Sequence, residues 1–117
     1  MSTDITIYHN PRCSKSRAAL ELLREQGYEP RVVEYLKHPP SEAELASILK
    51  LLGMEPRELM RRKEEDYTRE KLDNPGLTRR ELIRALHDHP RLIERPIVLA
   101  NGKAALGRPP ERVLHIL

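Results

Sequence analysis

Residues 4–36, DITIYHNPRCSKSRAALELLREQGYEPRVVEYL, determine the fold expected for this chain. The first six are rich in β-branched and aromatic side chains, as in a short buried strand. The pair Asn10-Pro11 interrupts this run, and over residues 14–26 alanines and leucines then recur at helical spacing. Residues 31–36 have the composition of a second strand. Strand, helix and strand in about thirty residues predict a βαβ unit with parallel strands.

The rest of the chain has the pattern of helices followed by a hairpin. Residues 41–89 contain helix-start patterns at Ser41 and Thr78 and no strand pattern, which predicts a helical insertion. Asn101-Gly102 lies between two short apolar runs and is the strongest short-range signal for a β-hairpin. Pro109-Pro110 then opens a final short helix. This order predicts an α/β protein of thioredoxin-like fold, with a small mixed four-stranded sheet and flanking helices. We expect a single domain over residues 1–117, with the helical insertion at about 41–89.

The composition excludes several classes of protein. Charged residues make up 33% of the chain and the mean hydropathy is −0.64, which excludes a membrane protein. The hydrophobic fraction of 38% excludes a disordered chain. The net charge is only +3, both signs are interspersed, and there is no Trp or Phe for base stacking, so we expect no nucleic-acid partner. One cysteine excludes a disulfide framework. Because a single cysteine suits a reducing compartment and no apolar run approaches the length of a signal peptide, we expect a cytoplasmic protein. We also expect a monomer.

Cys13 is the candidate for chemistry because it lies just before the first predicted helix. The first-turn N–H groups and the helix dipole favour an anion at such a position. There is no acidic residue between positions 4 and 21, and three cations are close to the cysteine in sequence: Arg12, Lys15 and Arg17. Cysteines in such surroundings have pKa values of about 3.5–7.5. We predict a nucleophilic thiolate; the alternative is a small buried structural cysteine.

The residues after Cys13 restrict what the thiolate can do. A thiol phosphatase would have an arginine six positions later, where this chain has Ala19. A dithiol oxidoreductase would have a second cysteine near position 16, which is Ser16. The remaining pattern is that of a single thiol, so an outside thiol must complete any redox cycle. The helix N-terminus with its nearby Arg and Lys favours a phosphate-like or carboxylate-like substrate.

His87 and His89 form a His-x-His pattern of the kind found in metal sites. They lie at a predicted helix end, where positive charge is favoured by the dipole, and no further ligands cluster nearby in the sequence. We expect no metal site and no bound cofactor.

Three segments together resemble a known family. They are ITIYHNPRCSKSR (5–17), RELMRRKEEDY (57–67) and LIERPIVLANGKAALGRPPERVL (92–114), and they resemble the glutaredoxin-dependent arsenate reductases of thioredoxin fold, closest to the short chromosomal bacterial type. The resemblance covers essentially the whole chain in the same order. It implies that Cys13 is the nucleophile. The residues that it implies as thiolate-stabilising are His9, Ser16 and Arg17. Those that it implies as oxyanion-binding are Arg61 (or the adjacent Arg62), Arg95 and Arg108. Pro96 is the candidate for the cis-proline that faces the cysteine in this fold.

The implied activity is the reduction of arsenate to arsenite, as in arsenical resistance, through an adduct of the Cys13 thiolate with arsenic. Glutathione would be a co-substrate and glutaredoxin a partner. The residues add independent support, because Arg95 precedes and Arg108 follows the predicted hairpin, whose two ends meet. Two alternatives stay open. One is a related thiol transferase with another substrate. The other is a transcriptional regulator of the same superfold that binds RNA polymerase, although such regulators usually have a second cysteine where this chain has Ser16.

Overall fold

The computed structural model describes residues 4–94 and 96–117. The chain divides into two compact units. The first comprises Met1–His38 and Arg95–Leu117, and the second comprises Pro39–Glu94. The second unit contains the predicted helical insertion and extends it by a few residues at each end.

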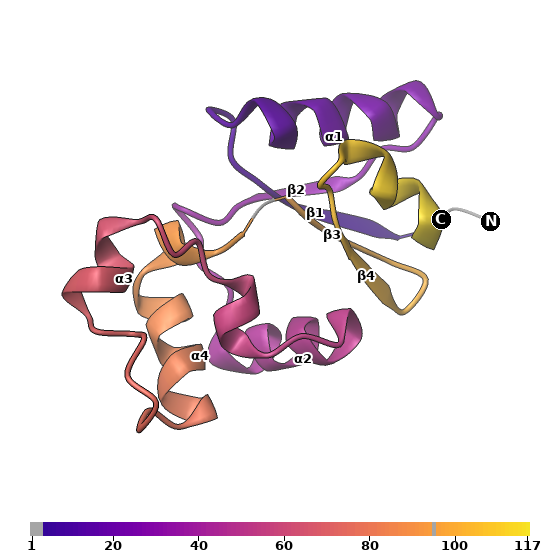
Figure 1. Ribbon diagram of the computed structural model, residues 1–117. Coiled ribbons are helices and arrows are strands. Elements are labelled where there is room, and N and C mark those ends of the chain that lie inside the picture. Colours follow the sequence, from indigo (N-terminus) through magenta and orange to yellow (C-terminus); the bar gives the residue numbers. More distant parts are fainter. Residues whose placement is uncertain (1–3, 95) are drawn as a thin grey trace. The chain divides into compact units, whose positions relative to one another are not determined.

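The first unit contains a mixed four-stranded sheet, as predicted (Figure 1). Its strands are β1 (Ile5–His9), β2 (Arg31–Glu34), β3 (Ile97–Ala100) and β4 (Lys103–Leu106), in the order β2-β1-β3-β4. β1 pairs in parallel with β2 and antiparallel with β3, and β3 pairs antiparallel with β4. The βαβ unit and the hairpin are therefore confirmed. Because β1 is a central strand, the loop that follows it starts from the middle of one end of the sheet.

Helix α1 (Ser14–Glu25) and the 3-10 segment η3 (Pro110–Ile116) pack against each other on one face of this sheet (Figure 1). Between them lies an aliphatic core, as the absence of Phe and Trp requires. Its buried members are Ile5, Ile7, Ala19, Leu20, Leu23, Val98, Ala100, Val113 and Ile116. This packing fixes α1, and with it the N-terminus of α1, against the central strand.

Strand β2 is two residues shorter than its composition predicts. It ends at Glu34, and the chain turns there, since the N–H groups of Lys37 and His38 both donate to the Glu34 carbonyl oxygen. The partner strand β1 ends at His9, which is opposite Glu34 in the register. The edge strand therefore has no partner beyond this point, however well Tyr35 suits a strand.

The second unit consists of α2 (Glu42–Leu52), η1 (Pro56–Leu59), α3 (Glu65–Arg69), α4 (Arg79–Asp88) and η2 (Pro90–Leu92). Both predicted capping boxes are present: Ser41 with Glu44 starts α2, and Thr78 with Glu81 starts α4. Their reciprocal hydrogen bonds satisfy first-turn N–H groups that have no partner within the helix. α2 packs against α4. None of the helices in the described part of the chain is long and apolar enough to cross a membrane.

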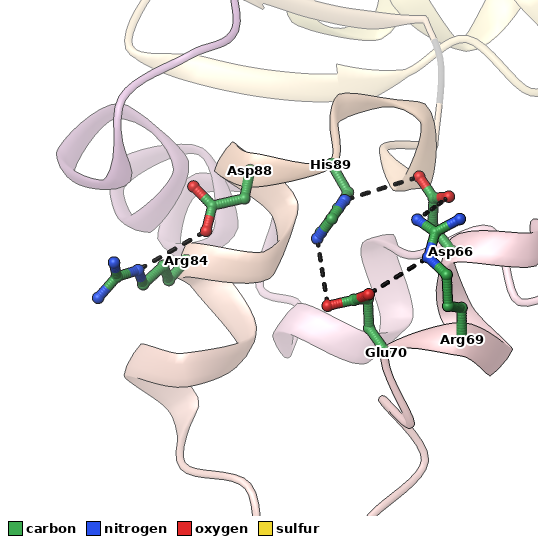
Figure 2. Close-up of polar contacts among 6 residues, drawn as sticks. All are labelled: Asp66, Arg69, Glu70, Arg84, Asp88 and His89. Carbon is green, nitrogen blue, oxygen red and sulfur yellow. Dashed lines mark hydrogen bonds and ion pairs between the residues drawn. The ribbon is translucent and has the colours of Figure 1, made fainter.

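Polar contacts connect α3 to the end of α4 (Figure 2). Asp66 is buried and forms a 2.6 Å ion pair with Arg69. His89, just after α4, lies between Asp66 and Glu70, with nitrogen-to-oxygen distances of 3.9 and 3.5 Å. The contact of Asp66 with His89 joins residues that are far apart in the chain, so local sequence does not reveal it.

Candidate active site

Cys13 occupies the N-cap position of α1, as predicted, and is partly exposed. A tight turn precedes it, in which the Cys13 N–H donates to the Asn10 carbonyl oxygen at 3.0 Å. The Asn10 side chain accepts from the Arg12 N–H at 3.0 Å, which orders the same turn. The first turn of α1 contains no acidic residue. The helix therefore presents its partial positive charge to the cysteine without local compensation.

Ser16 and His9 form a buried polar pair beneath the Cys13 turn. Ser16 Oγ lies 2.6 Å from His9 Nδ1 and also accepts from the Asn10 N–H at 3.0 Å. Both side chains are buried. This pair ties the end of β1 to the first turn of α1, on either side of the cysteine.

Burial lowers the pKa of His9 below its ordinary value of 6.5. The carboxylate of Glu34, in the neighbouring strand, acts in the opposite direction, while the positive charges of Arg24 and Arg17 reinforce the effect of burial. The imidazole is therefore held in its neutral form more strongly than an exposed histidine. Ser16 Oγ, which also accepts from the Asn10 N–H, shares one hydrogen bond with Nδ1 of His9, and the tautomer of the neutral imidazole determines which of the two atoms donates.

Arg17 supports the loop from the exposed side. Its Nη1 donates to the carbonyl oxygen of Pro11 at 2.9 Å. A guanidinium group is thus held on the backbone of the turn that ends at Cys13. This position adds a cation to the helix N-terminus.

The two ends of the hairpin meet at the end of the sheet where β1 terminates. The Gly107 N–H donates to the Pro96 carbonyl oxygen at 2.9 Å, which continues the β3–β4 pairing by one step. Because Tyr8 pairs with Ile97, Pro96 follows at the register position next to the end of β1. The predicted meeting of the hairpin ends is confirmed at Pro96 and Gly107. Arg108, which is partly buried, follows directly.

Arg95 lies outside the described residues, and so does the Arg95–Pro96 peptide bond on which the cis-proline prediction for Pro96 depends. Both stay predictions. The Arg108–Pro109 bond is cis.

Arg61 belongs to the second unit. An isolated antiparallel bridge joins Met60 to Ile93, and the Arg61 N–H donates to the Leu92 carbonyl oxygen at 2.7 Å. The Arg61 side chain forms an ion pair with Glu64 at 2.7 Å. The neighbouring Arg62 is exposed. The register thus places six predicted residues at the same end of the sheet in the first unit: His9, Cys13, Ser16, Arg17, Pro96 and Arg108. Arg61, by contrast, is part of the second unit.

Sequence reasoning missed three residues around these positions: Asn10, Gly107 and Glu64. Asn10 forms three of the contacts that shape the Cys13 turn, and its signal was the known preference of asparagine for side-chain-closed turns. A Cβ on Gly107 would lie 2.6 Å from Cγ of Pro96, so any larger residue there would require the Pro96 ring or the backbone to shift. A glycine directly after a strand was the available signal. Glu64 had none beyond its spacing of three from Arg61.

His87 and His89, the pair considered for metal binding, contact other groups. His87 Nδ1 lies 2.9 Å from the Pro40 carbonyl oxygen, and His89 faces Asp66 and Glu70. Over residues 4–94 and 96–117, no group of three His, Cys, Asp or Glu side chains is arranged to hold a metal ion.

A model described as the ArsC family matches residues 8–116, a span that includes the Cys13 turn and the hairpin end. The chain belongs to the ArsC family. One curated relative is the arsenate reductase of Neisseria meningitidis serogroup A, which is 55% identical over 115 residues that cover 97% of this chain and 98% of the relative. Another is the protein YfgD of Escherichia coli K12, 55% identical over 118 residues, with 100% and 99% covered.

Solved structures of ArsC relatives agree with this fold. An arsenate reductase from Vibrio cholerae is 49% identical, covers both chains completely and superimposes with a TM-score of 0.97. A putative arsenate reductase from Yersinia pestis is 55% identical, with a TM-score of 0.93 over 97% of this chain and 100% of the other. The predicted thioredoxin-like fold and the predicted family are both confirmed.

Proposed function

We propose that this protein is an arsenate reductase, which reduces arsenate to arsenite through a covalent adduct on Cys13, with glutathione as co-substrate and glutaredoxin as partner. The observation that carries the proposal is the position of Cys13 at the N-terminus of α1, at the same end of the sheet as Arg108. ArsC relatives named arsenate reductase, 49–55% identical to this chain, support the same reaction.

The first step is nucleophilic attack by the Cys13 thiolate on the arsenic of arsenate. A sulfur–arsenic bond forms, and one arsenate oxygen leaves as water after protonation. The N-terminus of α1 favours the thiolate before the attack, because its partial positive charge lies beside the sulfur. It also favours the oxyanion that approaches.

The electrons for reduction come from outside the chain, because Cys13 is the only cysteine in the sequence. Glutathione displaces a second arsenate oxygen as water and forms its own sulfur–arsenic bond. A glutaredoxin thiolate then attacks the glutathione sulfur, and the electron pair of that sulfur–arsenic bond goes to arsenic, which becomes trivalent. Hydrolysis of the remaining bond to Cys13 releases arsenite. The products are arsenite, water and a mixed disulfide of glutaredoxin with glutathione.

Arg61, Arg95 and Arg108 are the residues to which we assign oxyanion binding. An arsenate anion repels a thiolate, so cations must neutralise its charge before the two can approach. Arginine suits this task because its planar donors match two oxygens of a tetrahedral oxyanion. Each charge-assisted hydrogen bond contributes about 1.5–3 kcal/mol.

His9, Ser16 and Arg17 are the residues to which we assign stabilisation of the thiolate. Arg17 places a positive charge on the backbone of the Cys13 turn, through its bond to Pro11. The buried His9–Ser16 pair holds β1 and α1 in the geometry that points the helix N-terminus at the sulfur. A reductant pool of glutathione is cytoplasmic, and we place the protein there as a monomer.

A component-omission assay tests the reductants. We expect arsenate-dependent turnover with glutathione and glutaredoxin together, and a rate near background when either is left out. Turnover that persists without glutaredoxin would reject this reductant and leave the arsenate chemistry intact.

Replacing Arg108 tests the oxyanion site in the same assay. We expect Arg108→Ala to lose at least about tenfold in kcat/KM, since one charge-assisted contact corresponds to roughly one to two powers of ten in rate. Arg112→Ala, an exposed arginine in the next turn of chain, is the matched control and should keep full activity. Full activity of Arg108→Ala would remove this residue from the site.

A further inference from the structure

The ion pair of Arg61 with Glu64 is short and partly shielded from water. Arg61 Nη1 donates to Glu64 Oε1 at 2.7 Å, and the two side chains are 28% and 29% exposed. The backbone reinforces the contact, since the Glu64 N–H donates to the Arg61 carbonyl oxygen at 3.1 Å. A charge-assisted hydrogen bond at this distance restricts a guanidinium more than a solvated pair does.

Glu64 is the N-cap residue of α3, yet its carboxylate does not cap that helix and is directed to Arg61 instead. The first turn of α3 already has two other carboxylates, Glu65 and Asp66, to complement its dipole. The helix therefore does not account for the orientation of the Glu64 side chain.

We propose that Glu64 is a positioning residue for substrate binding, which holds Arg61 by Nη1 and so orders the guanidinium whose remaining donors bind the oxyanion. The inference rests on the proposed function of Arg61. A guanidinium has five N–H donors, and the contact with Glu64 uses one edge, leaving Nε and Nη2 able to bind two oxygens together. The bond from the Arg61 N–H to Leu92 fixes the backbone from which this side chain extends.

In this role the charge of Glu64 and its hydrogen bond to Arg61 have opposite effects on oxyanion binding. Its negative charge alone would weaken the attraction of Arg61 for an anion, whereas its hydrogen bond orders the guanidinium. Glu64→Gln keeps an oxygen acceptor and removes the charge, and Glu64→Ala removes both. If orientation is the function, the glutamine variant binds the oxyanion at least as well as the wild type and the alanine variant binds it less well.

The test combines steady-state kinetics with direct binding of arsenate. We expect Glu64→Ala to raise the KM for arsenate about fivefold with little change in kcat, and Glu64→Gln to restore the wild-type KM. In an Arg61→Ala background, Glu64→Ala should have no further effect, because Glu64 acts through Arg61. Glu65→Ala, an exposed neighbouring acid, is the control and should leave KM unchanged.

A second readout keeps this inference distinct from the proposed activity. It is the arsenate concentration that half-protects Cys13 from alkylation by iodoacetamide, and the same fivefold increase is expected for Glu64→Ala. If the wild type shows no turnover but Glu64→Ala raises the half-protecting arsenate concentration as expected, the positioning role of Glu64 is supported and the proposed reduction of arsenate is contradicted. If the wild type turns over arsenate and Glu64→Ala behaves like Glu65→Ala in both readouts, or if its effect persists without Arg61, the positioning role is wrong.

Discussion

Cys13 differs from a structural cysteine in the contacts of its neighbours. Asn10 closes the turn before it, Arg17 holds the outer backbone of that turn, and Ser16 joins the helix to His9. The reactive position could be predicted from sequence, because the helix start, the nearby cations and the missing acids are all local signals. The His9–Ser16 pair could not, because it requires the strand and the helix to be placed together.

His9 gives a prediction at the scale of one residue. Its pKa is lowered in the folded state by burial, so below pH 6.5 the unfolded chain takes up a proton at this position before the folded protein does. The contribution of His9 to the free energy of unfolding is therefore fully present above pH 6.5 and is lost as the pH falls through the lowered pKa.

Urea unfolding between pH 8 and pH 5 measures this effect. We expect the stability of the wild type to fall below pH 6.5 more steeply than that of His9→Gln, whatever the difference between them at pH 8. Parallel pH profiles for the two proteins would show that His9 does not titrate in this way.

Among the elements, the sequence predicted those that depend on neighbours in the chain. The hairpin is an example: Asn101 and Gly102 both adopt positive φ angles, 54° and 69°, as the expected tight turn requires. The end of β2 was predicted two residues too late, because it depends on where its partner β1 stops. The packing of the hairpin against α1 is likewise non-local, and it depends on the absence of a side chain at Gly107.

Gly107→Ala tests this packing. The added methyl group would lie 2.6 Å from Cγ of Pro96 and 3.4 Å from Cβ of Ala19, and a proline ring cannot move aside cheaply. We expect a loss of about 1–3 kcal/mol in the free energy of unfolding, as for other overpacked positions. Activity should fall as well, because Arg108 is the next residue.

Gly76→Ala is the matched control for this substitution. Its new methyl group would meet only the end of the Asn74 side chain, at 3.3 Å, so little loss is expected in chemical denaturation. Equal stability of the two variants would mean that Pro96 does not restrict position 107.

At the scale of the whole molecule, the second unit is inserted in the sequence between the two segments of the first. The first unit is made of two segments, and its central strand β1 pairs with β3 only after the chain has passed through the second unit. Unfolding the second unit would turn it into a long flexible loop between these segments, which raises the entropic cost of closing the sheet. A unit of fewer than about 60 residues also has little stability alone.

We therefore expect the two units to unfold together in one cooperative thermal transition, as the prediction of a single domain requires. In scanning calorimetry the calorimetric and van't Hoff enthalpies of unfolding should agree. A calorimetric enthalpy well above the van't Hoff value, or two resolved transitions, would show that the units unfold separately.

The most direct test of the proposed function is arsenate-dependent NADPH oxidation in the presence of glutathione, glutathione reductase and glutaredoxin, measured for the wild type and for Cys13→Ser. Replacing the thiol with a hydroxyl removes the nucleophile and nearly preserves the shape of the turn. We predict robust oxidation by the wild type that requires arsenate, and a background rate for Cys13→Ser. A wild-type rate no higher than that of Cys13→Ser would contradict the proposal that this ArsC protein reduces arsenate through Cys13.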